Sequence, residues 1–312
     1  MRRWLPLFTV LCLGAAVLVL AERHHAGTLA SPDAMLHLVA DAEREANRLP
    51  AKVWRLSDEQ EIAIGDEMAR QYLSGTEFQN QSVDVQQIQA YVAHVGMLVS
   101  VHARRRLPYR FHYVADPSMI NAFALPGGHV FIGEGLMQLM QHEDELAAVL
   151  GHEVEHIDLY HCAERVQFEA QMRRLHLEVI SDLASIPVSV FKAGYSKELE
   201  LEADREGTRI AVEAGFSPQG AISLFRAMEK RYREAEQRRP DSPEEEAERV
   251  VFQTLGDYFR SHPATNERIR ELQAFTESQH WPTKPQKPLD PDVQIALDAK
   301  PAENTRPPRV LQ

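Results

Sequence analysis

The sequence is poor in cysteine and in basic residues. Its 312 residues include two cysteines, Cys12 and Cys162, which rules out a disulfide framework or a cysteine-rich zinc finger. Lysine and arginine total 34 against 46 aspartates and glutamates, for a formal net charge of −12. A generic nucleic-acid-binding protein needs a basic face that displaces counterions. We therefore expect no nucleic-acid partner.

Long apolar runs are also scarce. The sequence contains one such run, near its N-terminus. Residues 4–21 are apolar apart from Pro6 and Thr9 and follow two arginines. Their length is at the lower limit for a membrane-spanning helix, and the ending Val19-Leu20-Ala21 also fits a signal-peptide cleavage site. We expect a signal peptide or an N-terminal membrane anchor, with lipidation of Cys12 as a third alternative. Each predicts an extracytoplasmic protein, with the bacterial periplasm favoured, that meets a membrane only through this segment.

The rest of the chain predicts a mostly helical α+β fold. A capping box at Ser57 and Gln60 begins the first helix, and helical spacing continues over residues 57–75, 83–103, 134–191, 198–214 and 218–238. Alternating residues predict short strands at 109–114, 121–125 and 129–132, with a hairpin turn at 126–128. The helical segment that follows these strands carries the chemistry described below. We expect it to pack beside the small sheet.

Four segments are expected along the chain. Residues 1–21 form the signal peptide or anchor, residues 22–56 a linker with a short helix, and residues 57–278 the main domain. Residues 279–312 hold seven prolines after Trp281 and show little periodicity. This composition is typical of a disordered tail.

The segment Gly151-His152-Glu153-Val154-Glu155-His156 carries the strongest chemical signal. Residues four apart lie on one face of a helix, so His152 and His156 can direct two imidazoles to one metal ion with Glu153 beside them. A catalytic zinc takes three protein ligands and leaves one position open. Glu153 can then act as the general base toward water. The flanking sequence is strongly apolar, and buried polar groups of this kind need partners or a metal.

The third ligand is expected downstream, in Glu198-Leu199-Glu200-Leu201-Glu202-Ala203-Asp204. One carboxylate can bind the metal, while another a turn later accepts the free N–H of a ligand imidazole. By spacing alone, Glu198, Glu200 and Glu202 compete for the metal. His129 and His161 lie near the site in sequence, but no spacing requires them to bind, so local packing is the simpler interpretation of both.

Together these motifs resemble the HtpX and CAAX-prenyl-protease superfamily, metallopeptidase family forty-eight, and most closely its periplasmic BepA and LoiP branch. The family combines H-E-x-x-H with E-x-x-A-D, matched by His152, Glu153 and His156 and by residues 200–204. The resemblance runs from about residue 57 to residue 270. It implies a gluzincin-like zinc metallopeptidase domain with a small sheet beside the zinc helix and one Zn²⁺ per chain. Glu200 is implied as the third ligand and Asp204 as its second-sphere partner.

The same resemblance extends to two further segments. Asn121-Ala122-Phe123 begins a strand and turn like those that precede the zinc helix in the family, and its free edge could bind an extended substrate. His262, in Ser261-His262-Pro263, corresponds to a histidine that can take the fourth zinc position in BepA-like members and hold the enzyme latent. The tetratricopeptide array of BepA has no counterpart here, nor do the several apolar spans of integral-membrane members.

The function expected from these features is a zinc endopeptidase that acts on polypeptides, such as misfolded or unassembled envelope proteins. Two alternatives remain open at this point. The first is a non-proteolytic, chaperone-like zinc protein, which would have no need of a base at Glu153. The second is an amidase acting on cell-wall peptides.

Overall fold

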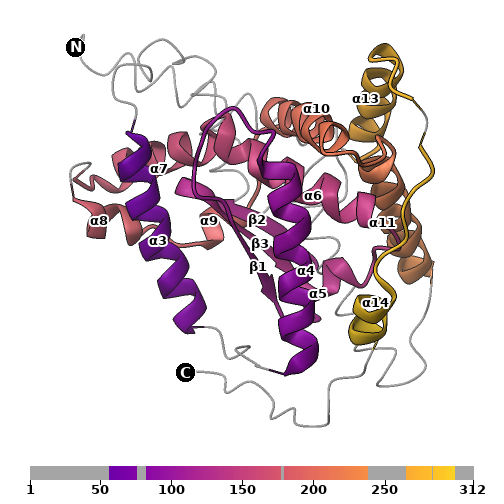
Figure 1. The fold of residues 1–312 in the computed structure, drawn as a ribbon. Helices are drawn as coiled ribbons and strands as arrows, with labels where there is room; N and C mark the ends of the chain where they lie inside the picture. The colour runs from indigo at the N-terminus through magenta and orange to yellow at the C-terminus, as the bar shows by residue number, and fades with distance from the viewer. Residues whose placement is uncertain (1–55, 76–81, 177–178, 238–264, 283, 299–312) are drawn as a thin grey trace. The chain divides into compact units, whose positions relative to one another are not determined.

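The computed structural model describes residues 56–75, 82–176, 179–237, 265–282 and 284–298. All of them belong to the unit Ala51–Gln312. Two helices precede the sheet, α3 (Asp58–Gly75) and α4 (Val83–Ser100). The sheet is followed by α5 (Glu134–Met137), α6 (Glu143–Asp158), α7 (His161–Arg173), α8 (Ile180–Ala184), α9 (Ser189–Lys192), α10 (Lys197–Glu213), α11 (Gly220–Gln237), α13 (Thr265–Ser278) and α14 (Pro291–Asp298) (Figure 1). The predicted mostly helical α+β class is confirmed.

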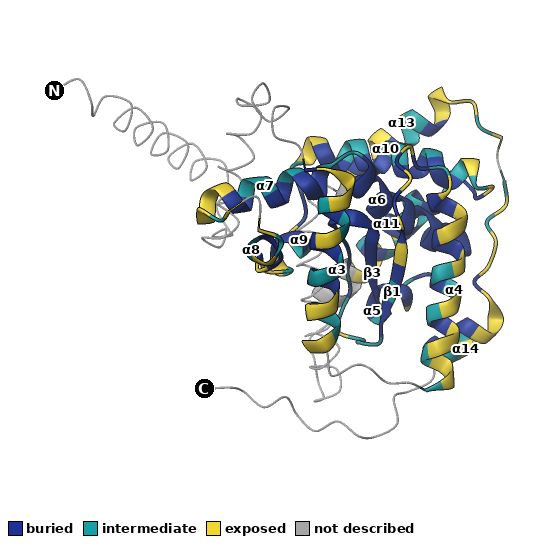
Figure 2. Cartoon of the chain, turned by 60° about the vertical axis from the view of Figure 1, so that its left-hand side comes forward, coloured by how far each residue is buried: buried dark blue, intermediate teal, exposed yellow. Residues whose placement is uncertain are grey.

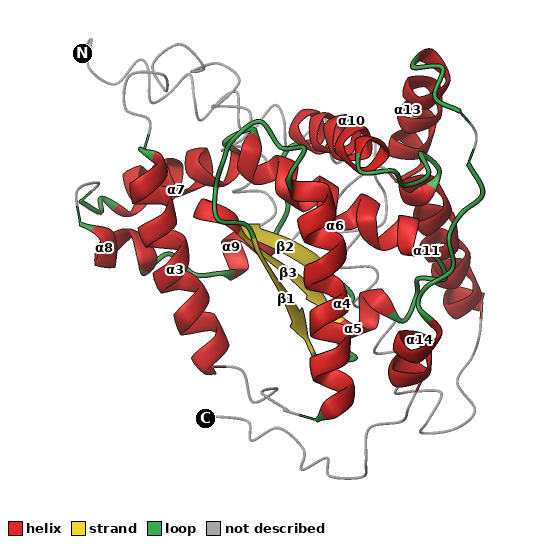
Figure 3. Cartoon of the chain, viewed as in Figure 1, coloured by secondary structure: helices red, strands yellow, loops and turns green. Residues whose placement is uncertain are grey.

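The sheet has three strands, β1 (Arg110–Val114), β2 (Ala122–Leu125) and β3 (His129–Gly133), in the order β1-β3-β2 (Figure 3). The 3₁₀ turn η2 (Pro126–Gly128) joins β2 to β3 as an antiparallel hairpin, as predicted, while β1 pairs parallel to β3. β2 is therefore an edge strand. Because Gly133 N–H donates to Asn121 O and bonded pairs alternate along an antiparallel ladder, the peptide groups of Ala122 and Ala124 point away from β3.

Helix α6 lies at the centre of the packing. It contacts the sheet, α4, α10 and α11, and almost all of its residues are buried, as the dark blue of α6 and the strands shows in Figure 2. Its surroundings form one hydrophobic core with residues of every strand. A helix buried on all sides exposes no solvated face, so its polar residues must be satisfied from neighbouring elements.

The backbones of α6 and α10 touch where two glycines face each other. A Cβ atom on Gly207 would lie 2.6 Å from His152 N, and one on Gly151 would lie 2.6 Å from Gly207 O. Any side chain at either position would push the helices apart. This contact brings the two motif-bearing helices as close as their backbones allow.

Replacing Gly207 with alanine is therefore expected to lower the free energy of unfolding by about 1–3 kcal/mol, the usual cost of overpacking. The measurement is urea denaturation of the variant and the wild type. Gly75 provides the control, because a Cβ atom there meets nothing within 4 Å and alanine should be neutral or stabilising. Equal stability of Gly207→Ala and the wild type would show that the close approach is not required.

Two sequence-based expectations differ from the structure. The segment expected to be helical over residues 134–191 is divided into five separate helices, α5 to α9. The chain turns after α6 and α7 at Tyr160 and Arg174, which have φ values of 67° and 55°. These are left-handed conformations that a non-glycine sequence does not signal.

The expected disordered tail is wrong for residues 284–298. Leu289, Val293 and Leu297 are buried in the core, and the segment bonds to the first turn of α6. Lys287 N–H donates to Asp144 Oδ2 at 2.6 Å, and Glu143 N–H donates to Lys287 O at 2.8 Å. The prolines are accommodated because the stretch before α14 is not helical, and Pro288 forms an isolated β-bridge with His142. Asp144 lies in the first turn of α6, where the helix dipole also favours its negative charge.

Among the described residues, no helix is both long and apolar enough to cross a membrane. The N-terminal segment 1–21 lies outside the described residues, as do all but the last residue of the linker 22–56 and the end of the chain after residue 298.

Candidate metal centre

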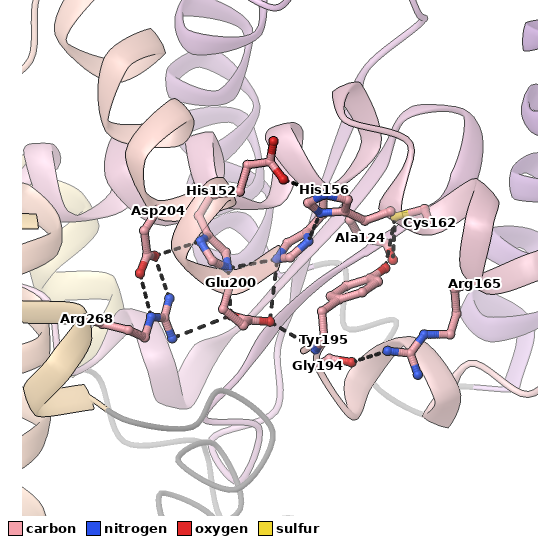
Figure 4. A network of polar contacts seen from close by, with 12 residues as sticks. Ala124, His152, His156, Cys162, Arg165, Gly194, Tyr195, Glu200, Asp204 and Arg268 are labelled. Carbon is pink, nitrogen blue, oxygen red and sulfur yellow. Dashed lines mark hydrogen bonds and ion pairs between the residues drawn. The ribbon is translucent and has the colours of Figure 1, made fainter. Parts of the chain in front are cut away.

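The predicted histidine pair lies on the buried face of α6 that meets α10. His152 and His156 are one helical turn apart, and their Nε2 atoms are 3.0 Å from each other. Glu200 projects toward them from α10, with Oε2 3.4 Å from His152 Nε2 and Oε1 3.7 Å from His156 Nε2 (Figure 4). Sequence spacing alone left three glutamates in competition. The structure turns Glu200 inward, while Glu198 is exposed.

These three side chains fit a tetrahedral metal ion. Their ligand atoms all lie within 4.8 Å of one another, and the three separations run from 3.0 to 3.7 Å. Zinc bonds of about 2.0–2.2 Å in a tetrahedron place ligand atoms about 3.3–3.5 Å apart. Two imidazoles and a carboxylate are also a donor set that zinc prefers.

Negative charge around His152 makes the site favourable for a cation. Asp204 Oδ1 lies 3.0 Å from His152 Nδ1, which leaves Nε2 directed at the other two side chains. Burial disfavours the charged imidazole, but hydrogen bonds and charges from Asp204 and Glu200 outweigh it and raise the pKa of His152 to about 10. A positive charge is therefore stabilised between these groups.

Arg268, from α13, contacts the carboxylates of both Asp204 and Glu200. Its Nε and Nη2 atoms donate to the two oxygens of Asp204, each at 2.6 Å, and Nη1 is 3.6 Å from Glu200 Oε2. Burial alone would raise the pKa of Asp204, but the charge and hydrogen bonds of Arg268, followed by those of His152, lower it below its usual value. Asp204 is thus held as a carboxylate behind His152.

Tyr195 supports the other side of the cluster. Its backbone N–H donates to Glu200 Oε1 at 3.0 Å. Its ring stacks on His156 with centroids 4.2 Å apart, and its hydroxyl lies 3.3 Å from the Cys162 thiol. The orientations of Glu200 and His156 are therefore both fixed by one residue just before α10.

A pocket opens beside the cluster on the side of α11. Its lining includes Glu153 and His152 together with apolar side chains such as Val149, Leu224 and Phe225. Ala122, from the edge strand β2, lines the same pocket. Glu153 thus shares this pocket with His152 and with Ala122 of the edge strand.

The structure therefore brings together most of the residues singled out in the sequence. His152, Glu153, His156, Glu200 and Asp204 meet at one point, and Ala122 borders it. Phe123 instead packs on the opposite face of the sheet from Ala122, and its ring stacks on Phe131 with centroids 4.8 Å apart. The side-chain oxygen of Asn121 accepts a hydrogen bond from the Ala122 N–H at 2.9 Å. His262 lies outside the described residues.

Three contributors to the site have little sequence signal. Arg268 follows the His262 motif, but nothing in its spacing indicates Asp204 as its partner. Tyr195 is one aromatic residue in a loop. His161, for which the sequence favours local packing, has its Nδ1 atom 2.9 Å from Nδ1 of His156. His129 does pack locally, with Nδ1 2.9 Å from His112 Nε2 and Nε2 2.8 Å from Asp66.

Comparison with known proteins places most of these residues inside one matched region. The pattern of Peptidase family M48 matches residues 82–276, more than half of the chain. The mitochondrial metalloendopeptidase OMA1 of Schizosaccharomyces pombe is 30% identical over 196 residues, covering 59% of this chain and 52% of that protein. The beta-barrel assembly-enhancing proteases of Yersinia pestis and Escherichia coli K12 are 30% and 29% identical, covering 55% and 53% of this chain. The matched regions cover 38% and 36% of those two proteins. The chain thus spans about half or less of the length of these relatives.

Proposed function

The chain belongs to peptidase family M48, and from this we propose that it is a zinc-dependent endopeptidase with Glu153 as its general base. The observation that carries the proposal is the buried cluster of His152, His156 and Glu200, with Glu153 in the adjoining pocket. These three residues would hold one zinc ion, which supplies Lewis acidity and lowers the pKa of water.

The roles of the chain's own residues follow from their positions. The Glu153 carboxylate removes a proton from the attacking water and later delivers it to the leaving amine nitrogen. The Asp204 carboxylate accepts a hydrogen bond from Nδ1–H of His152 and keeps Nε2 free for the metal. Arg268 keeps Asp204 ionised and aligned for this task.

The direct test is the metal content and caseinolytic activity of the purified protein. We expect one zinc per chain by elemental analysis, and casein cleavage that a chelator stops and added zinc restores. Zinc without cleavage by either the wild type or His262→Ala would instead favour a binding protein. Absence of zinc would overturn the proposal.

We also propose that the edge of β2 binds substrate as an added strand. Support comes from Ala122, whose peptide group points away from β3 and which lines the pocket beside Glu153. Its N–H now donates to the Asn121 side chain at 2.9 Å, and an incoming peptide carbonyl would take the place of that oxygen. Such pairing gives main-chain affinity with little sequence preference.

Replacing Ala122 with proline removes this donor without touching the ladder to β3, as edge strands allow. We expect KM for a peptide substrate to rise about 2–10-fold, the equivalent of one hydrogen bond worth about 0.5–1.5 kcal/mol. Ala122→Gly keeps the N–H and serves as the matched control. An unchanged KM in Ala122→Pro would exclude pairing at this edge.

The substrates and location are further parts of the proposal. We propose that the protein acts on misfolded or unassembled envelope proteins outside the cytoplasm. The apolar residues 4–21 support this location, and two of its relatives are named for assembly of β-barrels. His262 is proposed as a switch that occupies the fourth zinc position, on the basis of its sequence motif. The switch predicts higher casein cleavage by His262→Ala than by the wild type. N-terminal sequencing of the protein from fractionated cells tests its location.

A further inference from the structure

The two histidines of the cluster are supported in different ways. Behind His152 stands the carboxylate of Asp204, 3.0 Å from Nδ1. Behind His156 stands a third imidazole, because His156 Nδ1 lies 2.9 Å from Nδ1 of His161. The usual partner of a metal-bound histidine is a carboxylate, a carbonyl or water. The contact between His156 and His161 therefore calls for its own explanation.

The position of His161 is fixed by the fold. It is the first residue of α7 and follows Tyr160, whose left-handed φ of 67° turns the chain sharply after α6. His161 is 3% exposed. The Tyr195 ring, which stacks on His156, also contacts His161 with centroids 5.8 Å apart. The imidazole is thus held against His156 from two sides.

The geometry determines where the protons must lie when Nε2 of His156 binds a metal. Its Nδ1 then carries the hydrogen, since a neutral imidazole has one N–H. Nδ1 of His161 must accept that hydrogen, so the His161 proton lies on Nε2. That atom faces Oε2 of Glu202 at 3.7 Å. The Nδ1 proton of His156 thus points at an acceptor, and the Nε2 proton of His161 lies on the side of a carboxylate.

We propose that His161 is a positioning residue for the zinc site: it accepts a hydrogen bond from His156 Nδ1 and fixes the ring with Nε2 toward the metal. Glu202 favours the tautomer of His161 that this requires. The proposal rests on the zinc-peptidase function above. It also gives Glu202 a role distinct from that of Glu200, although both belong to one acidic run in the sequence.

A pair of substitutions separates this role from simple packing. His161→Phe keeps the ring volume but has no acceptor, whereas Asn places its side-chain oxygen near the position of Nδ1. We expect zinc affinity of the full chain, measured by competition with a chromophoric chelator, to fall about 10–100-fold in His161→Phe and to recover to within about threefold of the wild type in His161→Asn. Thermal unfolding of both variants in chelator checks that each is folded.

The outcomes distinguish this inference from the proposed function. Wild-type affinity in His161→Phe, or equal losses in the Phe and Asn variants, would overturn the role of His161 and leave the peptidase proposal standing. A wild-type protein that binds no zinc would overturn both.

Nitrogen-15 NMR of the zinc-loaded wild type provides a measurement that needs no variant. Long-range couplings in the imidazole rings should show the proton of His161 on Nε2 and that of His156 on Nδ1. A proton on Nδ1 of His161 would contradict the proposed hydrogen bond directly.

Discussion

Replacing Glu153 with glutamine is expected to lower kcat/KM for casein or a peptide by about 10²–10⁴-fold, the usual contribution of a general base. Glutamine has the same shape but cannot take a proton from water. Because Glu153 is not one of the three clustered ligands, zinc content and thermal stability should remain close to those of the wild type. The loss should therefore appear in kcat rather than in metal binding.

Glu155 provides a matched control on the same helix. It is fully buried but does not line the pocket; its oxygens lie 3.7 Å from Arg104 and 3.6 Å from Arg209. Burial, followed by the nearby charge of Asp158, raises the pKa of Glu155 to about 8. Glutamine therefore resembles its neutral form, and activity of Glu155→Gln should stay near that of the wild type. Substantial activity in Glu153→Gln would assign the base to another group.

Arg268→Met is expected to lower the free energy of unfolding by about 3–5 kcal/mol, as happens when one partner of a buried ion pair is removed. Arg268 is 2% exposed, and its guanidinium group donates hydrogen bonds to both carboxylate oxygens of Asp204. Without it, the buried carboxylates of Asp204 and Glu200 lose the positive charge of the Arg268 guanidinium. Urea denaturation in the presence of chelator measures the effect.

Added zinc should offset part of that loss, because a cation at the cluster again compensates the two carboxylates. Arg270, on the same helix but exposed, is the control, and Arg270→Met should change stability by less than about 0.5 kcal/mol. A midpoint for Arg268→Met equal to that of the wild type would contradict the structural role of Arg268.

Local patterns in the sequence account for the elements that build the site. The capping box at Ser57 and Gln60 forms with both reciprocal bonds, and helical spacing correctly predicts α3, α4, α10 and α11. Spacing of four places His152 and His156 on one face of α6 because that relation is internal to one helix. The prediction of disorder after residue 278 is wrong for residues 284–298, because it follows the high proline content. Leu289, Val293 and Leu297 recur every four residues, which is the helical spacing of a buried face.

Relations between distant segments could not be predicted in this way. The choice of Glu200 over Glu198 and Glu202 depends on how α10 is rotated against α6, which the contact between Gly151 and Gly207 sets. The pairing of Arg268 with Asp204 spans 64 positions and depends on how α13 packs. A single sequence carries propensity and periodicity but does not encode such rotations in any local pattern.

The attachment of residues 284–289 to the start of α6 also has a consequence for synthesis. Lys287 and Asp144 are 143 positions apart, so the ribosome makes the helix with His152 long before the segment that binds its first turn. At 5–20 residues per second the interval is about 7–30 s. During translation the helix is therefore without this attachment and without Arg268. The side chains around the candidate metal centre are therefore complete only after Arg268 has been synthesised, when most of the chain has already been made.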